Sequence, residues 1–578
     1  MDINKLSKII QASQGKIKSD KVIKNVKIVN PISATIVKGD ISIVEDYIVG
    51  IGDYSGTEEI DGTNLYATSG LIDSHVHIES SLCTPRTFGE IVLPKGTTMI
   101  ITDPHEIVNV SGVDGLNFMI ESSKQTALKC LFMLSSCVPA TENEESGYIL
   151  DAKETEKLIN DNNIFGLAEM MNFHGLLNLD KDVLLKIVHS LNAGKVIDGH
   201  GVTLRGKSLN AYRASGVSTD HECTTTDDLI ERISAGMYVL LRHGSAAANL
   251  KNLLPAVNVR NYRRCCMCSD DKHLDDIIKY GHISHNIKIA IESGLDEFCA
   301  IAMATINTAE CYGLKDIGLI APGYKADIVL WDDLKNFNAN TVLVNGEVVV
   351  RDGIHIYNKN NIDISLEKVS NSINIKNITL EDLQIRMKSN KANVISIVDG
   401  DLVTKKVIRE VSVDSNSSFK FDSSKDILKV VAVERHKATG HIGLGLIENY
   451  KLKNGAIATS ISHDAHNIIA CGDNDEDILL AIKEIEKNSG GITAIKNGKI
   501  LHTLALNISG IITDASADYI IESIHKLHSL AYEELNVNRN IDPFMTLSFM
   551  ALSVIPDLKL TTKGLFDVLE NRFLDVSL

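Results

Sequence analysis

Eight short apolar runs recur between residues 70 and 271, most of them followed by polar or glycine-rich breaks and helix-like stretches. Continuous apolar strands that alternate with helices are typical of a parallel sheet covered on both faces. Eight such units in roughly 240 residues predict a (β/α)8 barrel. The runs are GLIDSHVH, TTMIITDPHE, CLFMLSSCVP, IFGLAEMM, KVIDGHG, GVSTDHE, MYVLLRHG and RCCMCSDD, of which the fifth and sixth are short.

Titratable residues stand at the ends of these runs. The carboxyl ends of all strands of such a barrel open on one face, so residues two hundred positions apart should converge there. The pair in "HVH" also shares one face of its strand, because residues i and i+2 point the same way. These residues are His75, His77, Asp103, His105, Glu106, Glu169, His200, His221, Glu222, His243, Asp270 and Asp271.

Neutral imidazoles and carboxylates are ligands for divalent Zn, Mn or Fe. The candidate ligands outnumber the needs of one tetrahedral ion, which favours a two-metal site with one bridging carboxylate. Such a site lowers the pKa of water, and a nearby carboxylate can move the proton. The chemistry indicated is hydrolytic attack on an sp² carbon of an amide, an ester or an amino-substituted heterocycle. The candidate ligands are His75, His77, Glu169, His200, His221 and Asp270.

These motifs resemble the amidohydrolase superfamily. Within it, the chain is similar along essentially its whole length to bacterial-type adenine deaminases, which typically carry a long C-terminal region. The resemblance implies a metal-dependent enzyme that converts adenine and water to hypoxanthine and ammonia through a metal-activated hydroxide. The stretches that carry it are GLIDSHVHIESS, TDPHEI, GLAEMMN, DGHG, STDHE, CSDD, ERHKATGHIGLGL and SHDAHN.

The resemblance also implies roles for individual residues. Two divalent ions are expected on the six candidate ligands, with Mn(II) or Fe(II) favoured and Zn(II) possible, and Glu169 stands where the family's bridging ligand lies. Asp270 matches the metal-bound aspartate that shuttles protons. Glu222 is expected to contact a ring nitrogen of the substrate, with a structural salt bridge as the alternative. The seventh run carries His243 where the family is expected to carry an acid.

Two further groups are expected to line the pocket or to support the ligands: Asp103, His105 and Glu106 after the second strand, and His463 and His466 in "SHDAHN". The latter motif has three interpretations. It could be a hydrogen-bonded turn of its own domain, a separate metal site, or a loop that closes the barrel mouth over a planar purine.

Two β-rich stretches, Val22 to Tyr66 and Ala326 to Gly353, bracket the predicted barrel and could pair into one sheet. The expected fold is therefore α/β: a metal-dependent (β/α)8 barrel with a small split β-sandwich domain and an additional C-terminal α/β domain. The predicted boundaries are 1–67 and 312–361 for the two parts of the small domain, 68–311 for the barrel and 362–578 for the C-terminal domain.

Charge and cysteine content narrow the range of partners. The 578 residues include 58 Lys and Arg against 75 Asp and Glu, a net charge of −17 that argues against nucleic acid or anionic membrane as the main partner. The ten scattered cysteines, the absence of a leader-like start and the absence of a long apolar run indicate a cytoplasmic protein. A small-molecule substrate and a homo-oligomer, a dimer or tetramer, are expected.

Alternatives remain at this level. Another amidohydrolase reaction, such as deacetylation of an N-acetyl amino sugar or opening of a cyclic amide, would use a similar ligand set, and a non-catalytic scaffold could share the fold. The stretch "GVTLRGKS", Gly201 to Ser208, matches a phosphate-binding loop. Its place directly after His200 instead predicts an ordinary loop at the barrel mouth.

Overall fold

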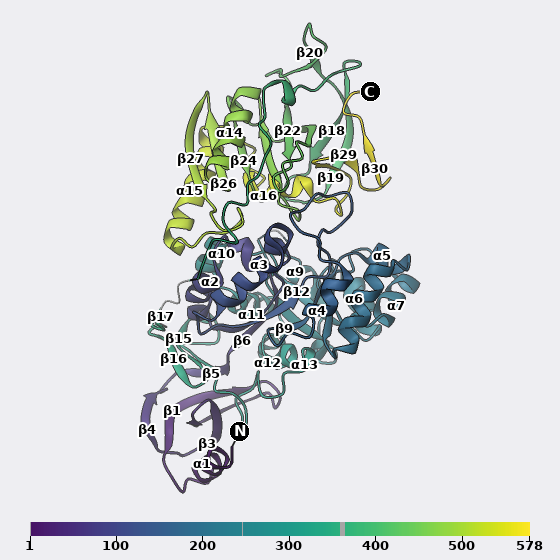
Figure 1. Cartoon of the computed structure of the whole chain (residues 1–578). Coiled ribbons are helices and arrows are strands. Elements are labelled where there is room, and N and C mark those ends of the chain that lie inside the picture. The colour runs from purple at the N-terminus through teal and green to yellow at the C-terminus, as the bar shows by residue number, and fades with distance from the viewer. Residues whose placement is uncertain (1, 246, 359–363) are drawn as a thin grey trace.

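The computed structural model describes residues 2–245, 247–358 and 364–578. The chain forms three parts stacked along one direction, with a small sheet domain at the bottom of Figure 1, the barrel in the middle and the C-terminal domain at the top. None of the helices within these ranges is long and apolar enough to cross a membrane.

The barrel is confirmed: within the described chain, each of the eight apolar runs holds one strand. Neighbouring strands from β6 to β10 and from β11 to β13 pair in parallel. The Ser218 amide donates to the Ile197 carbonyl between β10 and β11, and a bridge between Val76 and Asp270 joins β13 to β6. The strands are β6 (Leu71–Val76), β7 (Thr97–Thr102), β8 (Lys129–Leu134), β9 (Ile164–Met170), β10 (Val196–Gly199), β11 (Thr219–Asp220), β12 (Tyr238–Arg242) and β13 (Cys265–Cys268).

Helices follow these strands and cover the outside of the barrel. Local signals set where they begin: Thr84 caps α2 ahead of Pro85, and Thr225 and Asp228 form a capping box at α8. The helices of this part are α2 (Pro85–Val92), α3 (His105–Ser123), α4 (Ala152–Leu158), α5 (Phe173–Leu177), α6 (Lys181–Asn192), α7 (Gly206–Ala214), α8 (Thr226–Ser234), α9 (Leu250–Leu253), α10 (Leu274–Tyr280), α11 (Ile283–Glu292), α12 (Glu297–Met303) and α13 (Ile306–Cys311).

The small sheet is built from chain segments on both sides of the barrel. Strand β5 pairs with β1 on one edge and with β14 on the other, where Tyr66 lies opposite Trp331. Trp331 is fully buried and donates its indole N–H to the Thr68 hydroxyl at 2.8 Å. The elements are α1 (Ile3–Ser13), β1 (Ser19–Asn30), β2 (Thr35–Val44), β3 (Tyr47–Gly52), β4 (Gly56–Asp61), β5 (Tyr66–Ser69), β14 (Ile328–Trp331), β15 (Ala339–Val344), β16 (Glu347–Arg351) and β17 (Ile354–His355).

The C-terminal domain is centred on a mixed sheet in the order β19-β18-β23-β22-β25-β24-β26-β27. Its main elements are β18 (Lys391–Ile397), β19 (Thr404–Glu410), β22 (Ile427–Val433), β23 (Ile442–Glu448), β24 (Gly455–Thr459), β25 (Ile468–Gly472), α14 (Asp475–Lys487), β26 (Gly491–Lys496), β27 (Lys499–Ala505), α15 (Ala517–Glu533) and α16 (Pro543–Ser548). Smaller sheets are formed by β20 (Ser412–Val413) with β21 (Phe419–Lys420), and by β28 (Leu558–Thr561), β29 (Gly564–Asp567) and β30 (Arg572–Leu574).

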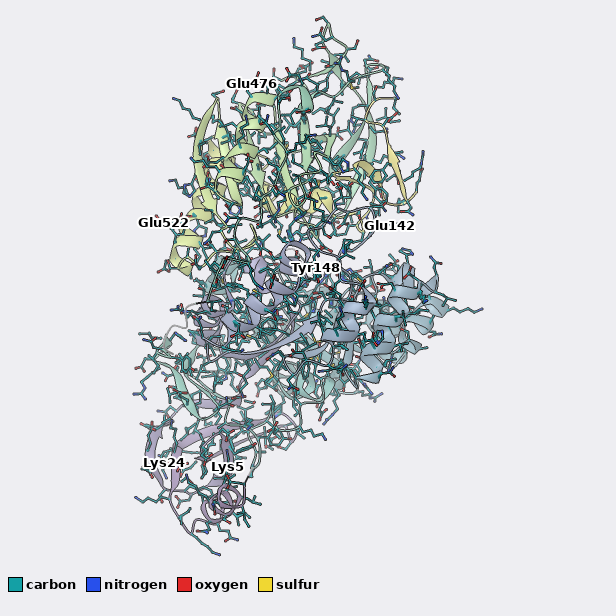
Figure 2. All side chains as sticks on the ribbon, in the orientation of Figure 1. Lys5, Lys24, Glu142, Tyr148, Glu476 and Glu522 are labelled. Carbon is teal, nitrogen blue, oxygen red and sulfur yellow. The ribbon has the colours of Figure 1, made fainter. Side chains whose placement is uncertain are left out.

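The long loop after β8 joins the barrel to the C-terminal domain. The Ser553 hydroxyl donates to Glu144 at 2.6 Å, and the Lys563 amine donates to the Glu142 carbonyl at 2.7 Å. Glu142 and Tyr148 mark this boundary in Figure 2. The predicted boundary at residues 361 and 362 lies outside the described residues, and the other domain boundaries stay predictions.

Candidate active site

The two histidines of "HVH" lie side by side at the carboxyl end of β6. Their Nε2 atoms are 3.1 Å apart, and both side chains are buried. The Nδ1 atom of His77 donates to the Asp103 carbonyl at 3.0 Å, which leaves its Nε2 lone pair directed into the barrel mouth. Two imidazole nitrogens this close to each other need a proton or a metal ion between them and a neighbouring acid.

Asp270 supplies that acid from the end of β13. Its Oδ1 atom lies 3.4 Å from His75 Nε2 and 3.3 Å from His77 Nε2. The closure of the barrel fixes it there, since the Asp270 amide donates to the His75 carbonyl at 3.0 Å. The first and last barrel strands therefore present three ligand atoms to one point.

Glu169, at the end of β9, lies at the centre of the cluster. Its Oε1 atom is 3.5 Å from His77 Nε2. Its Oε2 atom is 2.6 Å from His200 Nδ1 and 3.1 Å from His221 Nε2. Each carboxylate oxygen thus faces a different group of imidazoles, which is the arrangement that a ligand shared by two ions requires.

Strand β12 contributes Arg242, which sequence reasoning missed. Its guanidinium donates to both carboxylate oxygens of Glu222 and, from one of the same nitrogens, to Asp270 Oδ2 at 3.0 Å. His243, which drew attention in the sequence, instead packs its ring against His285 at 5.2 Å. The signal was an arginine that ends an otherwise apolar run, because a buried guanidinium needs acidic partners.

The salt bridge considered for Glu222 is present, and the carboxylate still borders the cluster. Its Oε1 atom lies 3.7 Å from both His200 Nδ1 and His221 Nε2. Burial alone would raise the pKa of Glu222, but the charge of Arg242 outweighs it and lowers the pKa below its usual value. Glu222 is therefore an ionised acceptor at neutral pH.

The same competition governs the central groups. Burial would lower the pKa of His77, yet its hydrogen bond to Asp270 raises that pKa well above the usual value. Burial would raise the pKa of Glu169, yet His200 and His221 hold it well below the usual range. The charged forms are thus stabilised by mutual contact, as expected where metal ligands converge.

The residues predicted to support the site also lie at this face. His105 Nδ1 is 3.1 Å from Asp103 Oδ2. Glu106, in the first turn of α3, receives His463 Nδ1 at 2.9 Å on one oxygen and His466 Nε2 on the other. The "SHDAHN" loop therefore reaches the barrel from the C-terminal domain, across more than 350 residues of sequence.

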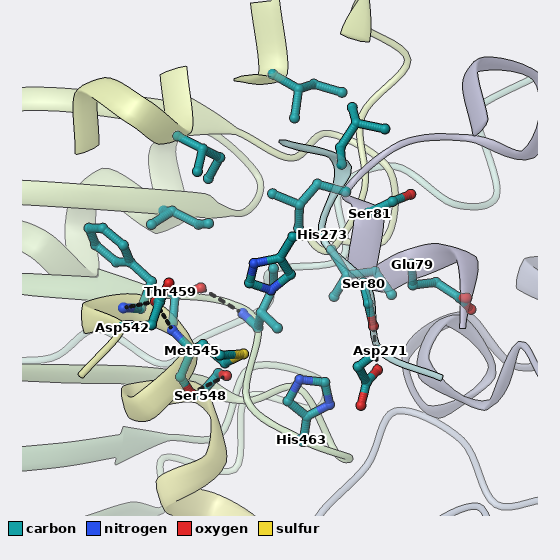
Figure 3. Close-up of a pocket in the computed structure, with 18 of the residues that line it drawn as sticks. Glu79, Ser80, Ser81, Asp271, His273, Thr459, His463, Asp542, Met545 and Ser548 are labelled. Carbon is teal, nitrogen blue, oxygen red and sulfur yellow. Dashed lines mark hydrogen bonds between the residues drawn. The ribbon is translucent and has the colours of Figure 1, made fainter. Parts of the chain in front are cut away.

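Two openings border the site between the barrel and the C-terminal domain. One is an apolar-walled cavity whose polar end holds Ser80, Asp271 and His463, as Figure 3 shows. The other is a wider groove, lined by Met171, His200 and the loop after β8. His200 has 18% of its side chain exposed, so this groove leads from solvent to the ligand cluster.

The donor set fits divalent metal ions. Neutral imidazole and carboxylate groups converge, the Nδ1 atom of His77 is occupied by a backbone carbonyl, and the side chains are almost completely buried. Buried groups in this pattern account for their own burial only if they are neutralised by one another or by cations.

Comparison with known proteins agrees with this geometry. Residues 66–349 match the model of the amidohydrolase family, and residues 401–572 match that of the adenine deaminase C-terminal domain. The chain is 46% identical to an adenine deaminase of Clostridium acetobutylicum over 96% of this chain and 97% of that protein. It is 44% identical to one from Geobacillus kaustophilus, over 98% of each, and 42% identical to adenine deaminase 2 of Desulfotalea psychrophila, over 100% of each. With relatives this similar from end to end, and with a divalent metal site on its barrel face, the chain belongs to the adenine deaminase family of amidohydrolases.

Proposed function

We propose that this chain hydrolyses adenine to hypoxanthine and ammonia. Water adds its oxygen to C6 of the purine, the bond from C6 to the amino nitrogen breaks, and that nitrogen leaves as ammonia. The observation that carries the proposal is the convergence of six donor side chains on one barrel face, in a chain similar over its full length to adenine deaminases.

The proposed ligands of two divalent ions are His75, His77, Glu169, His200, His221 and Asp270. Glu169 is the bridging ligand, because its two oxygens face different imidazoles. Mn(II) or Fe(II) is favoured and Zn(II) is possible for such a nitrogen and oxygen set. When bound, ions of this kind lower the pKa of water and polarise the carbon that water attacks.

Asp270 moves the proton in this proposal. Its Oδ2 atom is held by Arg242 at 3.0 Å, while Oδ1 faces the histidine pair. The carboxylate takes a proton from the attacking water and delivers it to the departing amino nitrogen. Arg242 keeps the carboxylate ionised and oriented, so that it is ready to accept the proton.

Glu222 and the C-terminal loop position the purine. Glu222 is ionised and lies at the edge of the cluster, where it can accept a hydrogen bond from a ring N–H. His463 and His466 hold the loop over the barrel face through Glu106. Such closure excludes water from a small planar substrate and strengthens the electrostatic interactions around it.

The proposed cell compartment is the cytoplasm, and the proposed assembly is a homo-oligomer. All ten cysteines are free thiols, eight of them buried, which supports a reducing compartment. The dimer or tetramer stays a prediction from the sequence.

Ammonia release from adenine by the full-length protein, reconstituted separately with Mn(II), Fe(II) and Zn(II), tests the proposed reaction. We expect stoichiometric hypoxanthine and ammonia with at least one metal. N-acetyl amino sugars and cyclic amides serve as comparison substrates. Acetate release or ring opening with a metal-loaded protein that leaves adenine untouched would overturn the assignment in favour of another amidohydrolase reaction.

A further inference from the structure

A second buried cluster joins the barrel to the C-terminal domain. It contains His105 and Glu106 at the start of α3, and His463, Asp464 and His466 from the loop between β24 and β25. Every one of these side chains is buried, with at most 9% of any residue exposed. Two carboxylates and three imidazoles therefore meet outside the set of six proposed catalytic ligands.

The hydrogen bonds of His466 make it a positioning residue for Glu106. The Ser462 amide donates to His466 Nδ1 at 3.2 Å, so the lone pair of the neutral ring is used there. The proton is then on Nε2, which donates to Glu106 Oε2. This contact leaves the other oxygen of Glu106, Oε1, to face the remaining members of the cluster.

His105 has the opposite arrangement. Its Nδ1 atom donates to Asp103 Oδ2 at 3.1 Å, the carboxylate contact that orients metal-binding histidines. The lone pair on Nε2 then faces Glu106 Oε1 at 3.4 Å and Asp464 Oδ1 at 4.0 Å. A lone pair that faces two buried carboxylates is repelled unless a cation or an additional proton lies between them.

The remaining contacts complete a set of four donors. His463 Nδ1 is 2.9 Å from the same Glu106 Oε1. Asp464 Oδ2 is buried and has no hydrogen-bond partner within the described chain. Donor atoms at 2.0–2.2 Å from a tetrahedral ion lie about 3.4 Å apart, and the measured separations of 2.9–4.0 Å bracket that value.

We propose that His105, Glu106, His463 and Asp464 bind a third divalent metal ion, which joins the barrel to the C-terminal domain. The two carboxylates carry a charge of −2 when both imidazoles are neutral, and one divalent ion balances it. The ion belongs to the Zn, Mn and Fe class, since the donors are two imidazole nitrogens and two carboxylate oxygens. It would fix the loop over the barrel mouth without taking part in the hydrolysis.

Metal analysis and anomalous diffraction test this site on the full-length protein loaded with Mn(II) and freed of loosely bound ions. We expect three equivalents per chain in the wild type and two in Asp464→Asn and His463→Gln. The control His525→Ala, at a histidine with 62% of its side chain exposed, keeps three. An anomalous peak at the manganese edge is expected between His105 Nε2, Glu106 Oε1 and His463 Nδ1.

Two results would overturn the proposal: two equivalents in the wild type with no anomalous peak between these atoms, or an Asp464→Asn variant that retains the peak and three ions. If either variant fails to fold, the wild-type anomalous map decides alone. The outcome is separate from the proposed reaction. Two ions with full deaminase activity overturn only the third site, whereas three ions without ammonia release overturn only the adenine assignment.

Discussion

The barrel face and the interior of the C-terminal domain both bury ionisable side chains, but in different company. On the barrel face, carboxylates and imidazoles approach one another at 2.6–3.7 Å. In the C-terminal domain, the fully buried Lys559 amine donates to the carbonyls of Leu402 and Phe549 at 2.9 and 3.1 Å. Arg435 is likewise fully buried, and it donates to the carbonyls of Ser509 and His466.

The consequence for charge is opposite in the two regions. Burial lowers the pKa of Lys559 to about 7, with distant acids unable to restore it. On the barrel face, burial is outweighed and the charged forms of Glu169, Asp270 and His77 are stabilised. A buried charge alone therefore does not identify a functional site, whereas several opposite charges that converge on one point do.

The largest expected effect comes from removing one converging ligand. His75→Ala or His77→Ala should lose bound metal and adenine hydrolysis together, because both Nε2 atoms face Asp270 at 3.3–3.4 Å. Metal content per chain and ammonia release are measured on the same sample. Full metal occupancy in both variants would place the metal centre elsewhere and break the contrast between the two regions.

Asp270→Asn tests the proton role with less damage to the cluster. The amide retains an oxygen ligand but cannot accept a proton, and general acid–base transfer is worth roughly 10²–10⁴-fold. We expect kcat to fall by about that factor while metal remains at least partly bound. A metal-loaded variant with near-normal kcat would move the proton shuttle to another group, and Glu222 would be tested next.

Arg242→Met should have a smaller effect that depends on pH. Arg242 lowers the pKa of both Glu222 and Asp270, although burial opposes it, so its removal raises both values. These acids must be ionised to accept protons, and the acid limb of kcat/KM should therefore move to higher pH. At a pH below that limb, the rate should fall about tenfold for every pH unit by which the limb moves.

The control for this variant is Arg409→Met, which removes an arginine with 45% of its side chain exposed and paired with Glu448 in the C-terminal domain. Exposed ion pairs contribute at most about 1 kcal/mol, so the pH profile should be unchanged. An identical displacement of the acid limb in both variants would show that net charge, rather than the contact with Asp270, sets the profile.

The sequence was sufficient to predict the barrel because each strand is a continuous apolar run that ends in a polar residue. That pattern located the strands from β6 to β13 and drew attention to the residues at their ends. It did not separate Arg242 from His243, since neighbouring residues at a strand end point to opposite faces and the direction depends on the register.

The contacts of the "SHDAHN" loop could not be predicted for a different reason. His463 and Glu106 are 357 positions apart, and no local pattern encodes which surface of another domain a loop will contact. The pairing follows from the docking of the C-terminal domain on the loop after β8 through Glu144 and Ser553. Only the presence of histidines beside an acid marked the motif as worth testing.

Lys559→Met sharpens the comparison from the side of the C-terminal domain. The pKa of Lys559 is lowered from 10.5 to about 7 in the folded protein, because burial disfavours the ammonium form. Between these two values the unfolded chain binds more protons, so this group makes the wild type more stable as pH rises. The methionine variant lacks that dependence.

The difference in melting temperature, variant minus wild type, should therefore be largest near pH 6 and should decrease towards pH 10. The absolute sign also includes the two carbonyls that lose their donor, so the trend with pH is the quantity to measure. A difference that stays constant over this range would show that Lys559 keeps its charge without a carboxylate partner, against the contrast between the two regions.

The smallest effect is expected for Lys207→Ala, in the stretch that resembles a phosphate-binding loop. Helix α7 does begin at Gly206, but the Gly206 amide donates to Glu231 Oε1 at 2.7 Å, where a bound phosphate would need that donor. Arg205 is paired with Asp228 and Glu231, so acids surround this helix end, and Lys207 itself is exposed. An isolated motif without converging partners should have no catalytic role, and kcat/KM for adenine should stay within about twofold, since surface substitutions usually cost no more than about 0.5 kcal/mol. The measurement pairs adenine kinetics with phosphate release from ATP in both proteins. Hydrolysis of ATP by the wild type that disappears in the variant would show that a motif can act here without convergence, and would remove the criterion by which the barrel face was distinguished.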